Sequence, residues 1–174
     1  GWDDYLPSPT PGESGKCYKT LPNQVTWAAF LAGCVAHGCQ MLCLRGEAEA
    51  IFVRDLLGMN RRCCYWGDKS CCSWICYMQR DPNGGPDQNW AWSESRASGQ
   101  PRCYSNYEGW APGEPNDWSG NDENCALMQP GGAGGTVNHA GSSGSWGRQA
   151  VPIWNDDTCD ETSTCMCEVI VGEL

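Results

Sequence analysis

The sequence predicts an α+β domain that is rich in disulfides and long irregular loops. Two segments with a helical period lie within residues 26–58, and short β-prone segments follow them. Helices and strands that are segregated along the chain in this way are typical of the α+β class. The chain carries 14 cysteines in 174 residues. Each disulfide they form stabilises such a loop-rich domain by about 2–4 kcal/mol.

The first helix is expected over residues 26–38 and the second over residues 47–58. In the first segment, apolar side chains recur at i, i+3, i+4 and i+7 and form one stripe: Trp27, Phe30, Leu31 and Cys34. The second segment carries acidic residues in its first turn, which suits the positive end of a helix dipole. Gly38 and Gly58 stand where each helix is expected to end.

The β-prone segments come after residue 58. They are SWICYM (73–78), NWAWSE (89–94), CALMQ (125–129) and CMCEVIV (165–171). The Gly- and Ser-rich residues 130–150 predict a long mobile loop. Residues 1–16, rich in Pro, Ser and Gly, predict an N-terminal arm or linker of the kind found in larger mosaic proteins. The expected domain therefore spans residues 17–174.

Composition limits the classes of partner. The formal net charge of −10 disfavours nucleic acid and anionic membrane, because both require a basic patch. No apolar run approaches the ~20 residues of a membrane span. So many cysteines persist as disulfides only in an oxidising compartment, which indicates a secreted or cell-surface protein. An all-cysteine zinc site is the rival interpretation, but the sequence contains no C-x2-C pair.

Two segments are rich in side-chain oxygens: APGEPNDWSGNDENC (111–125) and IWNDDTCDE (153–161). Calcium takes 6–8 oxygen ligands and accepts a mixture of carboxylates and neutral carbonyls. The candidate ligands are three carboxylates and two amides: Glu114, Asn116, Glu123, Asn155 and Asp156. A bond between Cys125 and Cys159 would tie both loops together. Solvated polar loops are the alternative interpretation, and EF-hand spacing is not met.

A set of motifs occurs in a fixed order between Cys17 and Glu168. The motifs are AAFLAGCVAHGCQMLCLRGEAEAIFVRDLL, WICYM, NWAWSE, YSNYEGWAPGEPND, ENCALM, WNDDTC and CMCE. In this order, with E-P-N and W-N-D among them, they resemble the C-type lectin-like domain. The resemblance implies a C-type lectin-like fold, in which two helices pack on short antiparallel sheets with long irregular loops.

The resemblance also implies specific bonds and ligands. It implies two disulfides, Cys34–Cys167 and Cys125–Cys159. It implies one Ca²⁺ held by the five candidate ligands, with the Asp156 carbonyl added and a cis peptide bond before Pro115. In lectins of this family, two vicinal sugar hydroxyls complete the calcium shell. The implied partner is therefore a glycan, which is bound and released unchanged.

The expected sugar depends on two features of the first loop. The E-P-N motif at 114–116 resembles sites for mannose, glucose, N-acetylglucosamine or fucose. The residues implied to contact the sugar are Glu114, Asn116, Trp118, Glu123 and Asn155. Trp118 keeps galactose open, because galactose-type sites place an aromatic ring there that stacks on the apolar sugar face.

Other functions of the fold stay open at this point. They are ice binding, as in antifreeze proteins, and protein recognition in which calcium only orders the loops. An enzyme is not expected, because neither His37 nor His139 has the sequence context of a nucleophile or metal triad. Ten of the 14 cysteines lie outside the implied pairs, some of them in the insertion RRCCYWGDKSCC (61–72). A second calcium near Asp117 is disfavoured, because Gln79 stands where an acidic residue is expected.

Overall fold

The computed structural model describes residues 5–6, 15–21, 23–58, 72–81, 83–93, 103–130 and 152–171. Two predicted features lie outside these ranges. The Gly- and Ser-rich segment of residues 130–150 is outside except for its first residue, and the 61–72 insertion is outside except for Cys72.

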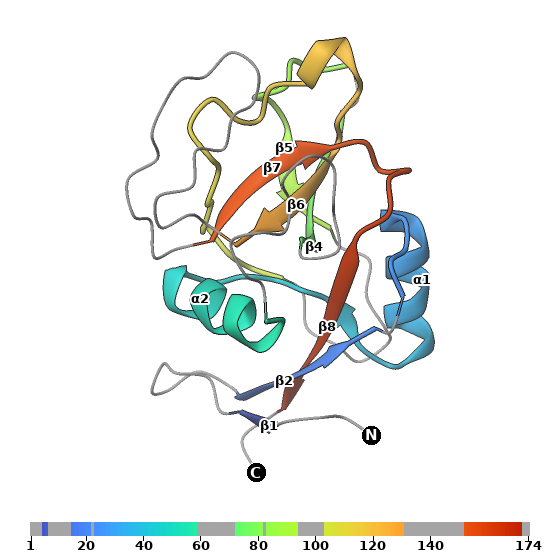
Figure 1. Ribbon diagram of the computed structural model, residues 1–174, viewed down its shortest axis with the longest axis vertical. Coiled ribbons are helices and arrows are strands. Elements are labelled where there is room, and N and C mark those ends of the chain that lie inside the picture. Colours follow the sequence, from blue (N-terminus) through green and yellow to red (C-terminus); the bar gives the residue numbers. More distant parts are fainter. Residues whose placement is uncertain are drawn as a thin grey trace.

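Eight described strands form a single bent sheet (Figure 1). Six follow one another in the hydrogen-bonded order β1-β2-β8-β4-β6-β7: Tyr5–Leu6, Gly15–Thr20, Thr164–Val171, Ser73–Gln79, Cys125–Gln129 and Ile153–Asp157. The short strands β3 (Gln40–Met41) and β5 (Trp90–Trp92) pair with β8 and β4 respectively. The strand pairs are antiparallel except β4–β8, which is parallel. Strand β8 therefore joins the lower strands β1 and β2 of Figure 1 to the upper strands.

Helices α1 (Trp27–Ala36) and α2 (Glu47–Leu56) lie on opposite sides of β8 in Figure 1. The Thr26 hydroxyl begins α1 by accepting a hydrogen bond of 3.3 Å from the Ala29 N–H. Gly38 follows the helix with φ of +70°, a conformation that glycine adopts without strain. The two predicted helices are confirmed. Within the described part of the chain, no helix is long and apolar enough to cross a membrane.

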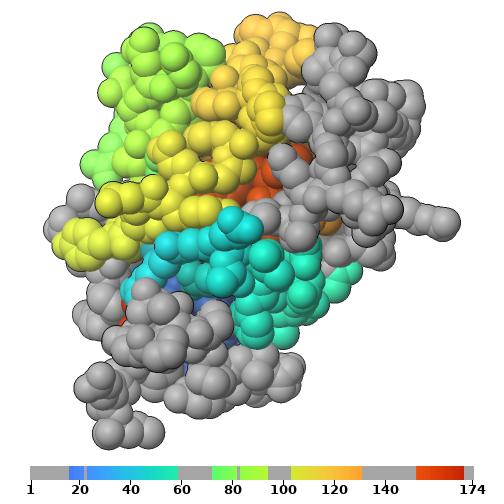
Figure 2. Space-filling view, turned by 90° about the vertical axis from the view of Figure 1, so that its left-hand side faces the viewer, coloured from blue at the N-terminus to red at the C-terminus, as the bar shows by residue number. Residues whose placement is uncertain are grey.

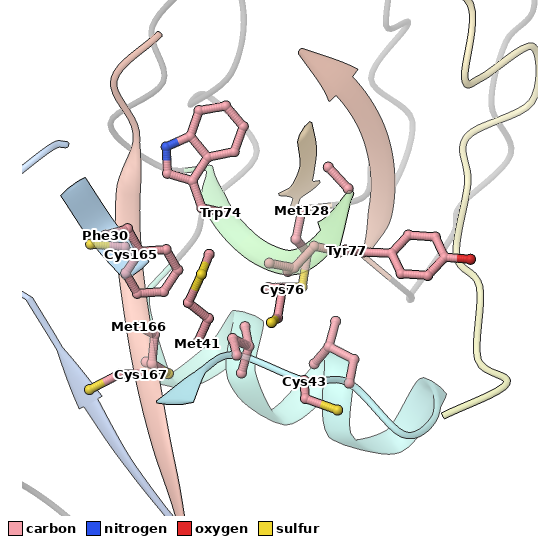
Figure 3. Packing of buried hydrophobic residues seen from close by; sticks show 14 of the residues in the cluster. Phe30, Met41, Cys43, Trp74, Cys76, Tyr77, Met128, Cys165, Met166 and Cys167 are labelled. Atoms are coloured by element: carbon pink, nitrogen blue, oxygen red, sulfur yellow. The ribbon is translucent and has the colours of Figure 1, made fainter. Parts of the chain in front are cut away.

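The hydrophobic core lies between the helices and strands β3, β4 and β8 (Figure 3). Phe30, Trp74 and Met166 are fully buried there, and each such side chain contributes about 1.5–3 kcal/mol relative to an exposed one. The indole N–H of Trp74 donates to the Val25 carbonyl at 2.9 Å, so the ring is buried without an unsatisfied donor. Trp27, Phe30 and Cys34 of the predicted α1 stripe are all buried, so this stripe faces the core.

A buried ion network ties β2 to α2 and β8. The Lys16 ammonium donates to the Cys43 carbonyl at 2.7 Å, to Glu168 Oε2 at 3.2 Å and to Glu49 Oε1. Lys16 is 2% exposed and Glu168 is fully buried. Gln40 Nε2 donates to the other oxygen of Glu168 at 2.8 Å. Buried charges are tolerated only when they are paired and hydrogen-bonded in this way.

The structure also contains strands that the sequence did not predict. The segment Ile153–Asp157 is expected as a polar loop, but it forms β7 with Trp154 and Asp156 fully buried. The polar composition of this segment gave no strand signal. The buried carboxylate of Asp156 belongs to the candidate site and not to the apolar core. Strands β2 and β3 were not predicted either. Tyr5–Leu6, within the expected N-terminal arm, pairs with β2.

Candidate functional site

The backbone holds the first oxygen-rich loop against β7. The Trp154 N–H donates to the Gly109 carbonyl at 2.7 Å, and the Ala111 N–H donates to the Trp154 carbonyl at 2.9 Å. A Cβ atom on Gly109 would lie 3.1 Å from Trp154 Nε1, which is a tight contact, so glycine suits this close approach. The start of the loop is therefore fixed to the strand that carries the second oxygen-rich segment.

The loop then turns toward the candidate ligands on β7. The peptide bond between Glu114 and Pro115 is cis, as the resemblance implies. The Glu114 side chain lies next to the Asp156 carboxylate, close enough for Asp156 to affect the pKa of Glu114. The structure thus brings candidate ligands from both segments together.

Asp156 is the centre of the site. Its Oδ2 accepts hydrogen bonds from the backbone N–H groups of Asn116 and Asp117, each at 2.8 Å. Its Oδ1 and the Oδ1 of Asn116 are buried and have no hydrogen-bond donor among the described residues. An unsatisfied buried acceptor costs about 1–3 kcal/mol. A cation is the species that satisfies several such oxygens at once.

Glu123 closes the loop from the other end. It is 8% exposed, and its Oε2 accepts a hydrogen bond of 2.8 Å from the Trp118 N–H. Asp117 lies in the left-handed region at φ 49°, and its Oδ1 accepts from the Glu123 N–H at 3.2 Å. Sequence reasoning assigned no role in the first calcium site to Asp117. Its side chain organises the loop, and the turn-favouring Asn-Asp pair at 116–117 was the available signal.

Strand β6 brings the two oxygen-rich segments together in register. Ala126 pairs with Asp156, so Glu123 leads into β6 near the ligands of β7. The disulfide Cys125–Cys159 lies at the same end of the strand pair, with its Cα atoms 5.2 Å apart. The structure therefore contains this disulfide that the resemblance implies.

The carboxylates of the site repel one another and are partly desolvated. Burial, followed by the neighbouring Asp156 carboxylate and the charge of Glu123, raises the pKa of Glu114 to about 8. Burial raises the pKa of Glu123 to about 7. The hydrogen bond from the Trp118 N–H lowers this pKa, and the charge of Asp156 raises it further. A divalent cation removes this repulsion. The donor set, hard oxygens of carboxylates and amides, fits calcium.

Asn155 and Trp118 complete the predicted site. Asn155 is half-buried, and its Nδ2 donates to the Asp156 backbone carbonyl. Trp118 begins the short 3-10 helix η2 (Trp118–Gly120) and is 41% exposed. It is one of the exposed large hydrophobic residues of the described chain.

Gln79 stands where an acidic ligand of a second calcium would be expected. Its Nε2 donates to the Gly85 carbonyl at 2.7 Å and to the Gln88 carbonyl at 3.0 Å. The side chain therefore supports a loop by donating hydrogen bonds.

The expected disulfide Cys34–Cys167 is absent from the structure. Both cysteines are reduced and buried, and Cys39 lies with them. A disulfide that was not predicted joins Cys43 to Cys103, with its Cα atoms 5.8 Å apart. Pairing could not be deduced from the sequence, since the number of cysteines allows many connectivities.

A cavity of about 660 Å³ is lined by none of the five candidate ligands. Its lining includes Arg80, Trp90, Tyr104 and Glu108. In Figure 2 the segment that carries Tyr104 and Glu108 crosses the middle of the face, below the part of the chain around Arg80 and Trp90. Two of the lining residues are hydrogen-bonded to each other, because the Tyr77 hydroxyl donates to the Glu108 carboxylate.

The chain is similar in sequence to proteins described as C-type lectins. It is 24% identical over 163 residues to C-type lectin domain family 10 member A of Homo sapiens, covering 90% of this chain and 38% of that protein. It is 26% identical over 171 residues to C-type lectin BML-2 of Bungarus multicinctus, covering 95% of this chain and 80% of that protein. The chain thus spans well under half of the human relative. No protein-family model matches the chain.

Solved structures share the fold. C-type lectin CEL-I from Cucumaria echinata matches with a TM-score of 0.58 and 19% identity, over 95% of this chain and 98% of that one. The C-type lectin domain of murine dendritic cell inhibitory receptor 2, in complex with an N-glycan, matches with a TM-score of 0.57 and 19% identity. This match covers 92% of this chain and 98% of that one. The herring type II antifreeze protein matches with a TM-score of 0.53 and 19% identity, over 93% of this chain and 99% of that one. These likenesses show the fold of this chain.

Proposed function

Because the chain is a C-type lectin-like domain, we propose that it binds carbohydrate through one calcium ion. The ligands of the ion are Glu114, Asn116, Glu123, Asn155 and Asp156. The observation that carries the proposal is the pair of buried oxygens without a donor, Asn116 Oδ1 and Asp156 Oδ1, within one cluster of carboxylates. Two relatives described as lectins and a fold neighbour bound to an N-glycan support the same function.

The calcium ion supplies a positive centre that accepts sugar hydroxyls as further oxygen ligands. The protein's part is to hold the carboxylates and amides in place before the sugar arrives. Asp156 does this through its hydrogen bonds to the loop backbone, and Glu123 through the Trp118 N–H. The same side chains then donate and accept hydrogen bonds with the hydroxyls. This is binding without a chemical step, so no catalytic residue is assigned.

The preferred sugar is of the mannose, glucose or fucose type, since E-P-N occupies 114–116. Galactose is the second candidate, and the exposed indole of Trp118 favours it. A ring stacked on an apolar sugar face adds about 0.5–1.5 kcal/mol if it behaves as other aromatic contacts do. We place the protein outside the cell, because its described disulfides require an oxidising compartment.

A glycan array measured with calcium and with chelator tests the proposal. We expect sugar signals that chelator abolishes and that added calcium restores. Sugar binding that is equal with and without calcium overturns the proposal.

Matched substitutions test the assignment of the ligands. In Asp156→Asn the side chain keeps an acceptor for the loop N–H groups but loses its charge, so we expect both calcium and sugar binding to fall strongly. Asp160→Asn removes the same charge one residue past Cys159 of the disulfide, at an exposed position outside the ligand cluster. This control should bind calcium and sugar as the wild type does. Equal binding by the two variants would mean that Asp156 is not a ligand.

Ice binding and protein recognition are the alternatives for this fold. An antifreeze protein is among the fold neighbours, but its 19% identity shows the fold alone. Thermal hysteresis in a freezing-point assay, without calcium-dependent retention on any sugar, would identify an ice-binding protein. A protein partner whose capture is insensitive to free sugar would identify the third function.

A further inference from the structure

The cavity of about 660 Å³ has no part in the proposed calcium site, because none of the five ligands lines it. Its volume falls within the range of about 300–1,000 Å³ that is usual for small-molecule sites in proteins. The lining comes from β4 and the residue after it, from β5, and from the segment of residues 103–108 on the face that Figure 2 shows. A cavity of this size is a candidate binding site of its own.

The wall of the cavity is aromatic. Tyr77 and Trp92 are buried, and Trp90 is half-buried. The indole N–H of Trp92 donates to the Ser105 carbonyl at 3.1 Å, and that of Trp90 donates to the Pro86 carbonyl at 2.6 Å. Because each indole N–H already has its acceptor, the two rings offer a ligand their apolar surface rather than a hydrogen bond.

The segment of residues 103–108 is fastened to the strands at both ends. The Cys43–Cys103 disulfide ties its first residue to the chain between β3 and α2. The Glu108 carboxylate at its other end accepts from the hydroxyl of Tyr77, whose ring extends from β4 away from β8 in Figure 3. The hydrogen bond from Trp92 holds its middle. The cavity is therefore formed before a ligand arrives, so binding requires little ordering of the protein.

The rim of the cavity is polar and carries charges of both signs. Four lining residues are exposed: Arg80, Tyr104, Asn106 and Glu108. The Arg80 guanidinium donates to the Trp92 carbonyl at 3.1 Å, which holds it beside the aromatic wall. The rim side chains include both donors and acceptors of hydrogen bonds.

The aromatic wall and the polar rim together select the chemistry of the ligand. A wholly apolar ligand would leave part of its surface against the polar rim. An anion is attracted to Arg80 but repelled by Glu108 and by the net charge of −10, and a cation is repelled by Arg80. A neutral sugar has an apolar ring face for the wall and hydroxyls that both donate and accept for the rim.

We propose that this cavity binds a neutral saccharide without calcium. Tyr104 packs against a ring face of the sugar, and Arg80 and Asn106 form hydrogen bonds with its hydroxyls. The cavity shares no residue with the five calcium ligands, so either site stands if the other fails.

Titration of the full chain in chelator tests the inference, because chelator keeps calcium from the proposed calcium site. The probes are maltotriose, cellotriose and triacetylchitotriose, and the readout is the NMR signal of each tryptophan indole N–H. We expect at least one probe to shift the signals of Trp90 and Trp92 until they saturate. The signal of Trp74, which is fully buried and does not line the cavity, should stay in place.

Matched substitutions locate the site. Tyr104→Ala removes an exposed aromatic residue of the lining, so we expect the affinity for the bound probe to fall by about 2–10-fold. Asn106→Ala should also weaken binding, because the sugar loses a hydrogen-bond partner. Val35→Ala shortens an exposed hydrophobic residue of α1 that does not line the cavity, and this control should bind as the wild type does.

Three results overturn the inference. The first is that no probe shifts the signals of Trp90 and Trp92 in chelator up to millimolar concentrations, or that such shifts appear only with calcium. The second is wild-type affinity in both Tyr104→Ala and Asn106→Ala. The third is tighter binding of N-acetyltryptophanamide or of a sulfated monosaccharide than of any neutral probe, which assigns the cavity to a peptide side chain or to an anion. If a variant does not fold, the wild-type titration still decides.

Discussion

The carboxylate of Asp156 accepts a hydrogen bond of 2.8 Å from the backbone N–H of Asn116, forty residues earlier in the chain. One candidate ligand thus fixes the position of another. The loop cannot move relative to β7 without breaking this bond, so the ligand set is organised by the protein's own contacts.

Gly109→Ala should weaken calcium binding although it removes no ligand. Its Cβ would lie 3.1 Å from Trp154 Nε1 and 3.2 Å from Trp154 Cε2, so the loop or the indole must shift. We expect a loss of about 1–3 kcal/mol in the free energy of unfolding, with weaker calcium binding by titration calorimetry. Gly46→Ala is the matched control and should lose much less, because a Cβ there meets nothing within 4 Å. Equal behaviour of the two variants would contradict the prediction.

Trp118→Ala should separate the two sugar classes. The backbone N–H that Glu123 accepts from is kept in the variant, so the calcium affinity should stay nearly unchanged. If the ligand is galactose, affinity should fall by about 2–10-fold, as expected for a lost contact of about 0.5–1.5 kcal/mol. If it is mannose, affinity should stay the same. Trp118→Phe keeps a ring and should retain most galactose binding, as measured by titration with free sugars.

In chelator, stability should fall as the pH rises from about 5 to about 8. The pKa values of Glu114 and Glu123 are raised in the folded protein to about 8 and about 7, from 4.5. The unfolded chain therefore loses these protons at lower pH than the folded chain does, and rising pH favours unfolding in this window. We expect the melting temperature to fall over this pH range in chelator, and to fall less when calcium is present.

The controls for the pH prediction use single substitutions. Glu114→Gln removes one of the two raised groups, so the fall in melting temperature should become smaller. Asp160→Asn, at an exposed position, should leave it as in the wild type. A fall of the same size in Glu114→Gln would mean that other groups cause it.

Lys16→Met should destabilise the fold strongly. The substitution leaves Glu168, which is fully buried, without its ammonium partner. Breaking a buried pair in this way costs about 3–5 kcal/mol. Adding Glu168→Gln removes the stranded charge, so the double variant should be more stable than Lys16→Met alone in urea unfolding. A double variant that is less stable than the single one would argue against this account.

Elements with local signals were predictable from the amino-acid chain alone. The stripe of Trp27, Phe30 and Cys34 predicted α1, because a helical period is visible without knowing the partner surface. The oxygen-rich loop is visible in its composition, and the cis bond before Pro115 was expected from the motif that resembles the family. The assignment of five calcium ligands stays a prediction.

Features that join distant segments became visible only in the folded chain. Ile153–Asp157 is polar and gives no strand signal of its own, and pairing with β6 makes it β7. The bond between Cys43 and Cys103 and the meeting of the three buried thiols depend on the same long-range packing. The physical reason is that local composition encodes helices and loops, whereas strand register and chain crossing decide which side chains meet.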